Sequence, residues 1–91
     1  MLVLPAELTS QQATACLHML VQGLKASPSA DVVVDTAALQ RFDSSAIAVL
    51  MECRREALAL GRKFSVAGMP ARLGELAALY GVGELLPVAA A

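Results

Sequence analysis

The chain has 91 residues, which is enough for one domain with one modest core. Apolar residues make up 57% of it and alanine alone occupies 18 positions, a composition that argues against disorder and predicts small side chains between closely packed helices and strands. The 7 basic and 8 acidic residues give a formal net charge of −1, so the sequence has neither the basic stripe of a nucleic-acid-binding protein nor the single-sign block of a membrane-surface helix.

The longest apolar runs, such as residues 46–51, are far shorter than the roughly 20 residues that a transmembrane helix needs. The first residues also lack the basic segment that precedes the apolar part of an export signal. We therefore expect a cytoplasmic protein.

The N-terminal third predicts a strand and then a helix. An apolar run at residues 1–4 is stopped by Pro5, and Thr9 with Gln12 has the pattern of a capping box that opens a helix. One face of this helix is apolar, with residues at i, i+4, i+7 and i+11, which are Ala13, Leu17, Leu20 and Leu24. The helix should end near Lys25.

The middle of the chain predicts a buried strand and a long helix. Residues 31–35, with the sequence DVVVD, form a β-branched run between two acids, which indicates a central strand buried on both faces. A loop through Gln40 and Arg41 leads to a helix over residues 43–60. Gly61 follows in the position where a left-handed cap usually ends a helix.

The last third predicts one more strand and one more helix. Residues 63–67 form the strand, Pro70 suits the first position of the helix, and Gly81 suits its end. The buried face of this helix is expected to consist of Leu73, Leu76, Ala77 and Tyr80. Residues 88–91 are expected to form a small C-terminal tail.

Strands that alternate with helices across short loops imply an α/β fold with a mainly parallel sheet. We expect a single domain over residues 1–91, with its ordered core at about residues 1–87. It should contain a sheet of about three to four strands, three helices and right-handed crossovers between the strands.

The helix over residues 43–60 carries two apolar stripes. The first could cover a sheet and consists of Ala46, Val49, Leu50, Cys53, Ala57 and Leu60. The second lies about 110° around the helix and consists of Ile47, Met51 and Leu58, with Arg54. Either a neighbouring helix covers the second stripe, as in ordinary helix packing, or it stays exposed as a docking face for a partner.

The sequence DSS at residues 43–45 has two interpretations. Asp43 or Ser44 is suited to cap the helix, because each offers an oxygen to the free N–H groups of the first turn. The hydroxyl of Ser44 could instead be accessible to a partner or a kinase, and a phosphate would add about −1.5 to −2 charges there. Asp43 would repel that phosphate, so the modification would disturb docking more than folding.

The sequence does not support a catalytic site or a metal site. A nucleophilic serine needs a base, and the single histidine, His18, is expected on the solvent face of a helix. Cys16 and Cys53 match no zinc or redox spacing, so we expect two buried thiols, with a disulfide as the alternative. The sequence thus predicts no enzyme activity, no cofactor and no metal site.

The chain resembles the STAS domain family over nearly its whole length. The resemblance rests on the strand DVVVD, the loop and helix start FDSSAIAVL, the segment GRKFSVAG, Met69 with Pro70, and the ending LAALYGVGELLP. The aliphatic second helix, the proline that starts the third helix and the ending are most similar to the small STAS subunit of Mla-type phospholipid-trafficking ABC transporters, the MlaB-type subunit. More distant similarity extends to anti-sigma-factor antagonists.

This resemblance implies a subunit that binds the cytoplasmic ATPase of the transporter and supports its assembly and activity, without catalysis of its own. It places the hydroxyl after the aspartate, here Ser44, at the ATPase contact. In the sigma-regulating relatives the matching serine is the one that is phosphorylated.

Two departures from the family matter. Ala46 stands where phosphorylated antagonists usually have glycine, which favours constitutive docking over a kinase switch. The family usually has another strand before the one that matches Leu2 to Leu4, whereas this sequence starts directly on it, so we expect that first strand to be missing and the edge of the Leu2 to Leu4 strand to be unpaired. Exposed strand edges recruit other strands, so we expect a homodimer through this edge or a partner that covers it.

The leading hypothesis is an interaction subunit for outer-membrane lipid asymmetry, peripheral to the inner membrane only through its ATPase partner. The expected partner-binding residues are Asp43, Ser44, Ser45, Ile47, Met51, Arg54, Arg55 and Leu58. The alternative is an antagonist that sequesters an anti-sigma kinase and is switched by phosphorylation of Ser44. A third hypothesis is a STAS domain that binds a small apolar ligand, although small side chains leave little room for a large cavity.

Overall fold

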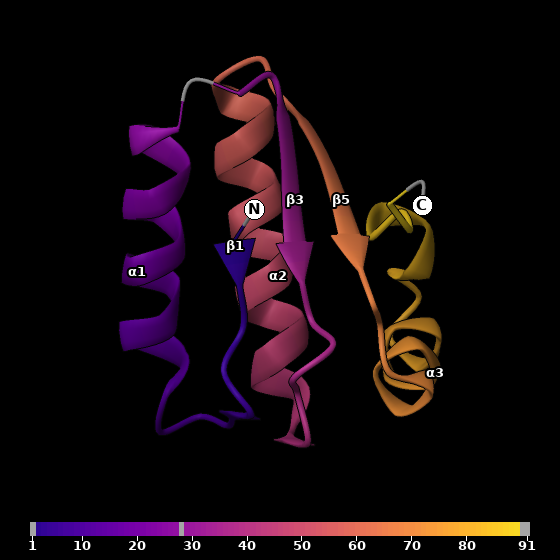
Figure 1. Ribbon diagram of the computed structural model, residues 1–91. Coiled ribbons are helices and arrows are strands. Elements are labelled where there is room, and N and C mark those ends of the chain that lie inside the picture. Colours follow the sequence, from indigo (N-terminus) through magenta and orange to yellow (C-terminus); the bar gives the residue numbers. More distant parts are fainter. Residues whose placement is uncertain (1, 28, 90–91) are drawn as a thin grey trace.

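Three parallel strands form the central sheet of the protein (Figure 1). The computed structural model describes residues 2–27 and 29–89, so the predictions for Met1 in the first strand and for residues 90–91 in the tail lie outside the described residues, as does Pro28. The strands are, in spatial order, β1 (Leu2–Val3), β3 (Asp31–Asp35) and β5 (Lys63–Ala67), and each neighbouring pair is parallel. The predicted α/β fold and the central place of residues 31–35 are confirmed.

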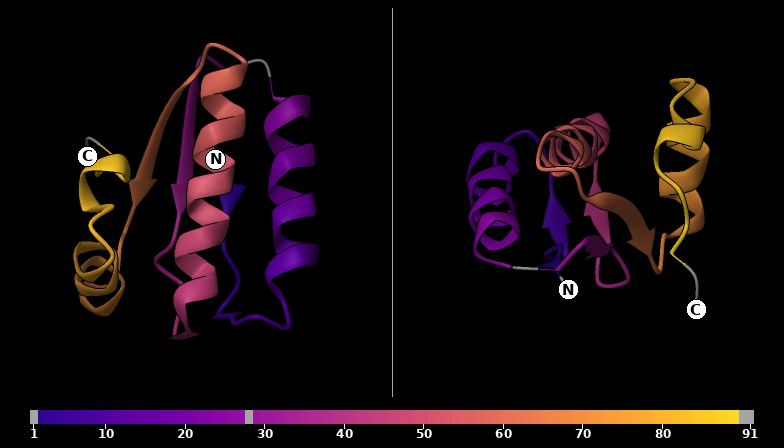
Figure 2. Two further views of the ribbon diagram at one scale, coloured as in Figure 1. Left: turned by 180° about the vertical axis from the view of Figure 1, so that it is seen from behind. Right: turned by 90° about the horizontal axis from the view of Figure 1, so that it is seen from above.

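Two helices cover one face of this sheet, and the third stands beside it (Figure 2). α1 (Ala13–Ala26) and α2 (Ser44–Ala59) pack side by side on that face, whereas α3 (Ala71–Leu79) lies beyond the β5 edge and contacts α2. No helix of the described residues lies over the opposite face. Within the same residues, none of the helices has the length and apolar character needed to cross a bilayer.

This one-sided covering explains the burial pattern along the strands. Successive side chains of a strand point to opposite faces of the sheet. In β3, Val32 and Val34 are buried under the helices, while Val33 between them is only partly buried. The prediction that residues 31–35 are buried on both faces was therefore wrong, because only one face carries a helical layer.

Two short strands were not predicted. β2 (Glu7–Leu8) pairs in parallel with β4 (Arg41–Phe42), and the carbonyl of Ala6 accepts the N–H groups of Gln40 and Arg41 at 2.8 and 3.0 Å. Runs of two residues are too short to show a period. This small sheet holds the N-terminal segment against the loop that leads into α2.

The first helix begins later than predicted. Gln12 Oε1 accepts the N–H of Thr9 at 2.9 Å and its hydroxyl at 2.7 Å, so the two residues of the predicted capping box do interact. They close a turn, however, in which the N–H of Gln12 donates back to the Thr9 carbonyl at 3.1 Å, and α1 begins only at Ala13. The N–H of Ser10 donates to the carboxylate of Asp43. The spacing of residues in the sequence does not reveal this tertiary hydrogen bond.

The C-terminal segment closes the outer edge of β5. After the 3₁₀ helix η1 (Gly83–Leu85), Val88 forms a parallel bridge with Val66. The N–H of Val66 donates to the Pro87 carbonyl at 2.8 Å, and the N–H of Ala89 donates to the Val66 carbonyl at 2.9 Å. Val88 and Ala89, which were expected in a tail, thus extend the sheet.

Both cysteines are buried and free, as predicted, and the alternative of a disulfide between Cys16 and Cys53 is not realised. Burial raises the pKa of both thiols, that of Cys53 to about 11, with the neighbouring Cys16 thiol and Glu56 carboxylate as smaller causes. A thiol with so high a pKa stays protonated at neutral pH and is a poor nucleophile.

Candidate functional site

The start of α2 is capped by Asp43. Its Oδ1 accepts the N–H of Ser45 at 2.8 Å, and its Oδ2 accepts the N–H of Ser10 at 3.3 Å. The bond from Ser45, with a smaller contribution from Ser10, holds the pKa of this carboxyl below its ordinary value. The capping interpretation is thus confirmed for Asp43, which also ties the segment before α1 to the start of α2.

Ser44 is exposed beside this cap. Asp43 already supplies the capping oxygen, and among the described residues the hydroxyl of Ser44 has no hydrogen-bond partner. Ser45, one residue later, is partly buried. Of the two serines, Ser44 is therefore the more accessible to another molecule.

Ser44 lies between two surface pockets. The larger, of about 610 Å³, lies between the start of α2 and α3, and its lining includes Phe42, Ser44, Arg72, Leu76, Leu79 and Tyr80. The smaller, of about 370 Å³, is lined by Ser44, Ile47, Ala48, Tyr80 and Val82. Because Ser44 and Tyr80 line both, we treat the two pockets as one feature and call it the α2–α3 groove.

Two large apolar side chains are exposed on the α3 side of the groove. Leu79 is 80% exposed and Tyr80 is 56% exposed. The prediction that Tyr80 is buried was wrong, because α3 ends at Leu79 and the helical period no longer directs the next side chain to the core. Leu73 and Ala77 are buried as predicted. The groove therefore has an apolar wall that its own domain does not cover.

Arg72 adds a positive charge to the same groove. The guanidinium carbon lies 5.2 Å from the centre of the Phe42 ring, at the distance of a cation–π interaction. Strand β4 places this ring directly before Asp43. Among the described residues, no carboxylate lies within ion-pair distance of Arg72.

The residues of the second predicted stripe of α2 differ in how exposed they are. Ile47 is only 6% exposed and belongs to the core, so the expectation that it stays exposed was wrong. The domain itself therefore covers this residue, and α2 does contact α3, a neighbouring helix of the kind that the alternative interpretation expected. Met51 and Arg54 are partly buried, whereas Leu58 is 46% exposed. Leu60, predicted to cover the sheet, is exposed as well because α2 ends before it.

Arg55 is engaged in ion pairs on its own helix. Its guanidinium binds the Glu52 carboxylate at 2.7 to 2.9 Å and lies 3.5 Å from that of Glu56. The hydrogen bonds from Arg55 lower the pKa of Glu52. These side chains form an ordinary exposed ion-pair cluster.

The predicted partner-binding residues thus fall into two groups. The groove contains Asp43, Ser44 and Ile47, with Ser45 directly beside it. The later part of α2, which lines neither pocket, carries Met51, Arg54, Arg55 and Leu58. At 1.5 Å per residue, Leu58 lies about 21 Å along the helix axis from Ser44. The residues that the sequence did not reveal form the opposite wall and are Arg72, Leu76, Leu79 and Tyr80.

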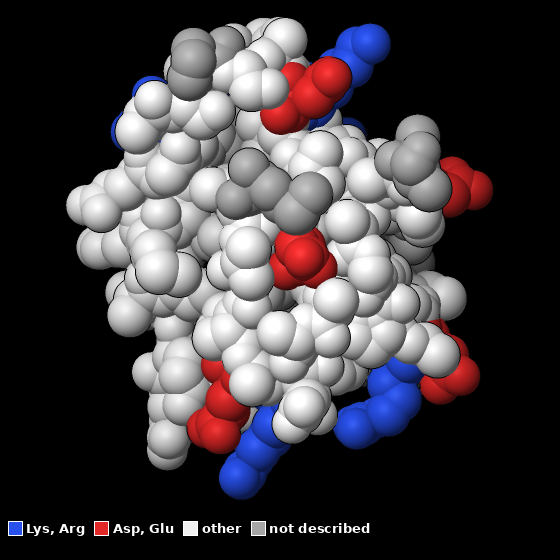
Figure 3. Space-filling model, viewed as in Figure 1, with Lys and Arg blue, Asp and Glu red and all other residues white. Residues whose placement is uncertain are grey.

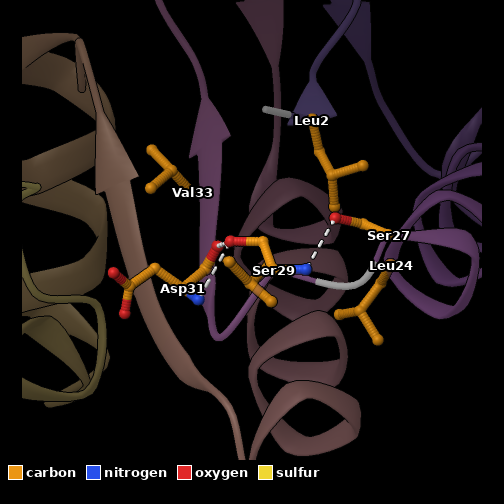
Figure 4. Close-up of a pocket in the computed structure, with 7 residues that line it drawn as sticks. Leu2, Leu24, Ser27, Ser29, Asp31 and Val33 are labelled. Carbon is orange, nitrogen blue, oxygen red and sulfur yellow. Dashed lines mark hydrogen bonds between the residues drawn. The ribbon is translucent and has the colours of Figure 1, made fainter.

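A separate notch of about 280 Å³ lies beside the first half of β3 (Figure 4). Among the described residues, β1 pairs only with the last two residues of β3. The hydroxyl of Ser29 accepts the N–H of Asp31 at 3.2 Å and donates to its carbonyl at 3.0 Å, which satisfies part of the open edge. The edge strand is also shorter than predicted, since β1 ends at Val3. The side chain of Leu4, the last residue of the predicted strand, is buried. Self-association through this edge stays a prediction.

In the described part of the chain, charged and potential metal-binding residues do not form a second site. On the face shown in Figure 3, acidic and basic side chains are scattered, mostly near its periphery, without a block of one sign. Within the described residues, no three His, Cys, Asp or Glu side chains are grouped as metal ligands would be. His18 is exposed on α1, as predicted, and lines neither pocket of the groove. The α2–α3 groove is thus the main candidate site.

One comparison with known proteins identifies a family for the chain. A family model described as "Mlab, STAS domain" matches residues 1–87. No curated protein matches the sequence.

Proposed function

The chain belongs to the STAS domain family, in the group described as Mlab, and from this premise we propose that it is a non-enzymatic subunit of an Mla-type phospholipid ABC transporter that binds the transporter's ATPase. The family match spans residues 1–87 of the 91 residues. STAS domains of this kind are interaction modules, and the ATPase is the partner that the resemblance implies. The protein would be cytoplasmic and reach the inner membrane only through this partner.

The observation that carries the proposal is the position of Ser44. Its hydroxyl is exposed and unpartnered among the described residues, and it lies between two pockets whose walls combine apolar side chains with a few charged ones. Interfaces commonly combine a desolvated apolar centre with polar groups that fix the orientation of the partner. Ser44 can supply such a polar contact, while Leu79 and Tyr80 supply apolar surface.

The apolar side chains of the groove provide a driving force for docking. Fully burying an aliphatic side chain stabilises a complex by about 1.5–3 kcal/mol before the cost of association is subtracted. Leu79 and Tyr80 are the most exposed large apolar side chains of the groove, so among these they would gain most from a partner. This shifts the expected docking surface from the middle of α2 towards α3.

A non-catalytic role agrees with the surroundings of Ser44. Nucleophilic activation of a serine requires a base within hydrogen-bond distance. Neither pocket is lined by histidine, and the Asp43 carboxylate is held by two backbone N–H groups. These surroundings support the proposal of a docking role for Ser44.

The test is binding of the purified chain to the Mla-type ATPase of the same organism. Wild-type protein should copurify with the ATPase, and Ser44→Glu and Leu79→Asp should lose it while their circular dichroism spectra and melting temperatures stay close to wild type. Met51→Asp should weaken the complex less, because Met51 lies outside the groove. Equal recovery of the ATPase with wild type, Ser44→Glu and Leu79→Asp would contradict the assignment.

The exposed hydroxyl also supports a second candidate, a phosphorylation-switched antagonist of an anti-sigma kinase. Ser44 is accessible enough to be a substrate. Intact mass after incubation with ATP and the candidate kinase separates the two functions. A stoichiometric phosphate that is absent from Ser44→Ala would favour the antagonist.

A further inference from the structure

Arg72 is a cation in the α2–α3 groove, and the docking function proposed above gives it no role. Its guanidinium is held over the Phe42 ring, and no carboxylate of the described residues lies within ion-pair distance. Stacking on a ring face leaves the N–H groups at the edge of the guanidinium plane free to donate. A positioned, unpaired guanidinium is suited to bidentate binding of a carboxylate.

The acidic side chains of the groove are in different situations. The oxygens of Asp43 already accept the N–H groups of Ser10 and Ser45. Glu75 is exposed, lies three residues after Arg72 on α3, and forms no ion pair among the described residues. A cation and an anion, both without ion-pair partners in the described part of the chain, therefore stand about one helical turn apart along the same wall.

The walls of the groove also limit the kind of partner segment. α2 and α3 bond their own backbone groups internally, and β4, which brings Phe42 to the groove, has only two residues, so the groove offers no long strand edge on which a partner strand could be added. A groove between two helices that is lined by both apolar and charged side chains is suited to an amphipathic third helix. Phosphate-rich partners are disfavoured, because two carboxylates, those of Asp43 and Glu75, line the groove together with Arg72.

We propose, on the basis of the docking function above, that the α2–α3 groove binds one amphipathic helix of the ATPase that sets a carboxylate against Arg72 and a basic side chain, one turn away, against Glu75. Aliphatic residues of that helix pack on Leu76 and Leu79. Apolar contact supplies most of the affinity, and the order of charges along α3 selects the partner and fixes the direction of its helix. The charged pair thus acts as the specificity determinant of the site.

The sharpest test exchanges the two charges. The double variant Arg72→Glu with Glu75→Arg keeps the composition and net charge of the chain but reverses the charge order along the groove. Asp31→Lys with Lys63→Asp is the control, because these two exposed residues of opposite charge are register partners on β3 and β5 and line neither pocket of the groove. Affinity for the purified Mla-type ATPase of the same organism is measured by biolayer interferometry for wild type and both exchanges.

The expected result at low salt is that the groove exchange binds about tenfold or more weakly than wild type, while the control exchange binds like wild type. The difference should shrink in 1 M NaCl, where the Debye length falls to about 3 Å and the apolar contact remains. Circular dichroism and thermal melts confirm that both double variants are folded.

Three outcomes would overturn the inference, each in a distinguishable way. Wild-type affinity of the groove exchange, together with loss of binding by Leu79→Asp, removes the charge-order claim and leaves the docking function standing. A defect of the same size in the control exchange means that charge order in the groove is not what selects the partner. Failure of the wild-type chain to bind the ATPase removes the proposed function and this inference together.

Discussion

The carboxylate of Asp43 lies 3.3 Å from the backbone nitrogen of Ser10 and accepts its N–H, although the two residues are 33 positions apart in the sequence and precede different helices. Its other oxygen caps α2 through Ser45 at 2.8 Å. One side chain therefore fixes both the start of the long helix and the turn before α1. The exposed Ser44 follows directly, so its position in the groove depends on this double contact.

Removal of the cap should lower stability and docking together. Asp43→Ala leaves two backbone N–H groups without their partner, so we expect a melting temperature several degrees below wild type and weaker ATPase binding. Asp43→Asn is the control, because an asparagine oxygen can still cap the helix, and it should stay close to wild type in both measurements. Equal losses in the two variants would show that charge, not capping, matters at this position.

The pKa of Asp43 makes part of the stability depend on pH. Its hydrogen bonds hold the pKa below the ordinary value near 3.9, so their stabilising effect is present above that pH and is lost as the pH falls through the folded-state pKa. Urea melts between about pH 5 and pH 2.5 should therefore show a steeper loss for wild type than for Asp43→Asn, which does not titrate. Parallel pH profiles would argue against this role of the carboxylate.

Ile47 and Leu79 should respond to substitution in opposite ways. Ile47 is 6% exposed, so Ile47→Ala should reduce the free energy of unfolding by about 2–5 kcal/mol. Leu79 is 80% exposed, so Leu79→Ala should change it by less than about 0.5 kcal/mol but weaken ATPase binding. Chemical denaturation and binding assays on both variants check this separation. A large loss of stability in Leu79→Ala would place that side chain in the core instead.

Substitution of two glycines by alanine tests how the backbone conformation at each position affects stability. Gly61 has a φ of 71°, and a Cβ at this position would meet no other atom of the described residues within 4 Å, so Gly61→Ala should cost about 1 kcal/mol through backbone strain alone. Gly74 lies inside α3, and a Cβ there would meet only the sulfur of Met69 at 3.6 Å, an ordinary contact. Gly74→Ala should therefore raise the free energy of unfolding by about 0.5–1 kcal/mol. Denaturant melts of both variants distinguish the two effects.

The thiols should be protected until the domain unfolds. With a pKa of about 11, Cys53 has a much smaller thiolate fraction at pH 8 than a free cysteine with a pKa near 8.5, and burial restricts access as well. We expect labelling by iodoacetamide at pH 8 to be at least about 100-fold slower in buffer than in 6 M guanidinium chloride. Mass spectrometry after timed quenching measures both sites, and rapid labelling of the native chain would contradict their burial.

Much of the fold could be predicted from the sequence because its cues are local. The β-branched run at residues 31–35, the strand at residues 63–67 and the long helix closed by Gly61 each follow from side-chain type, spacing or backbone freedom, and the structure contains all three. The same kind of cue identified Asp43 as a possible cap. The strands β2 and β4 were missed, because each is only two residues long and too short to show a periodic pattern of side chains.

The candidate site depended on tertiary contacts that periodicity does not describe. An apolar stripe on a helix shows that something covers it, but not whether that is the chain's own α3 or a partner, so Ile47 was placed wrongly. The exposure of Tyr80 was decided by where α3 ends, and the Arg72–Phe42 contact by how that helix packs beside β4. By itself the sequence determined the elements and the presence of a hydroxyl at the start of α2, since these follow from local chemistry. Only the tertiary structure decided which surface stays open around that hydroxyl, because burial depends on residues that are distant in the chain.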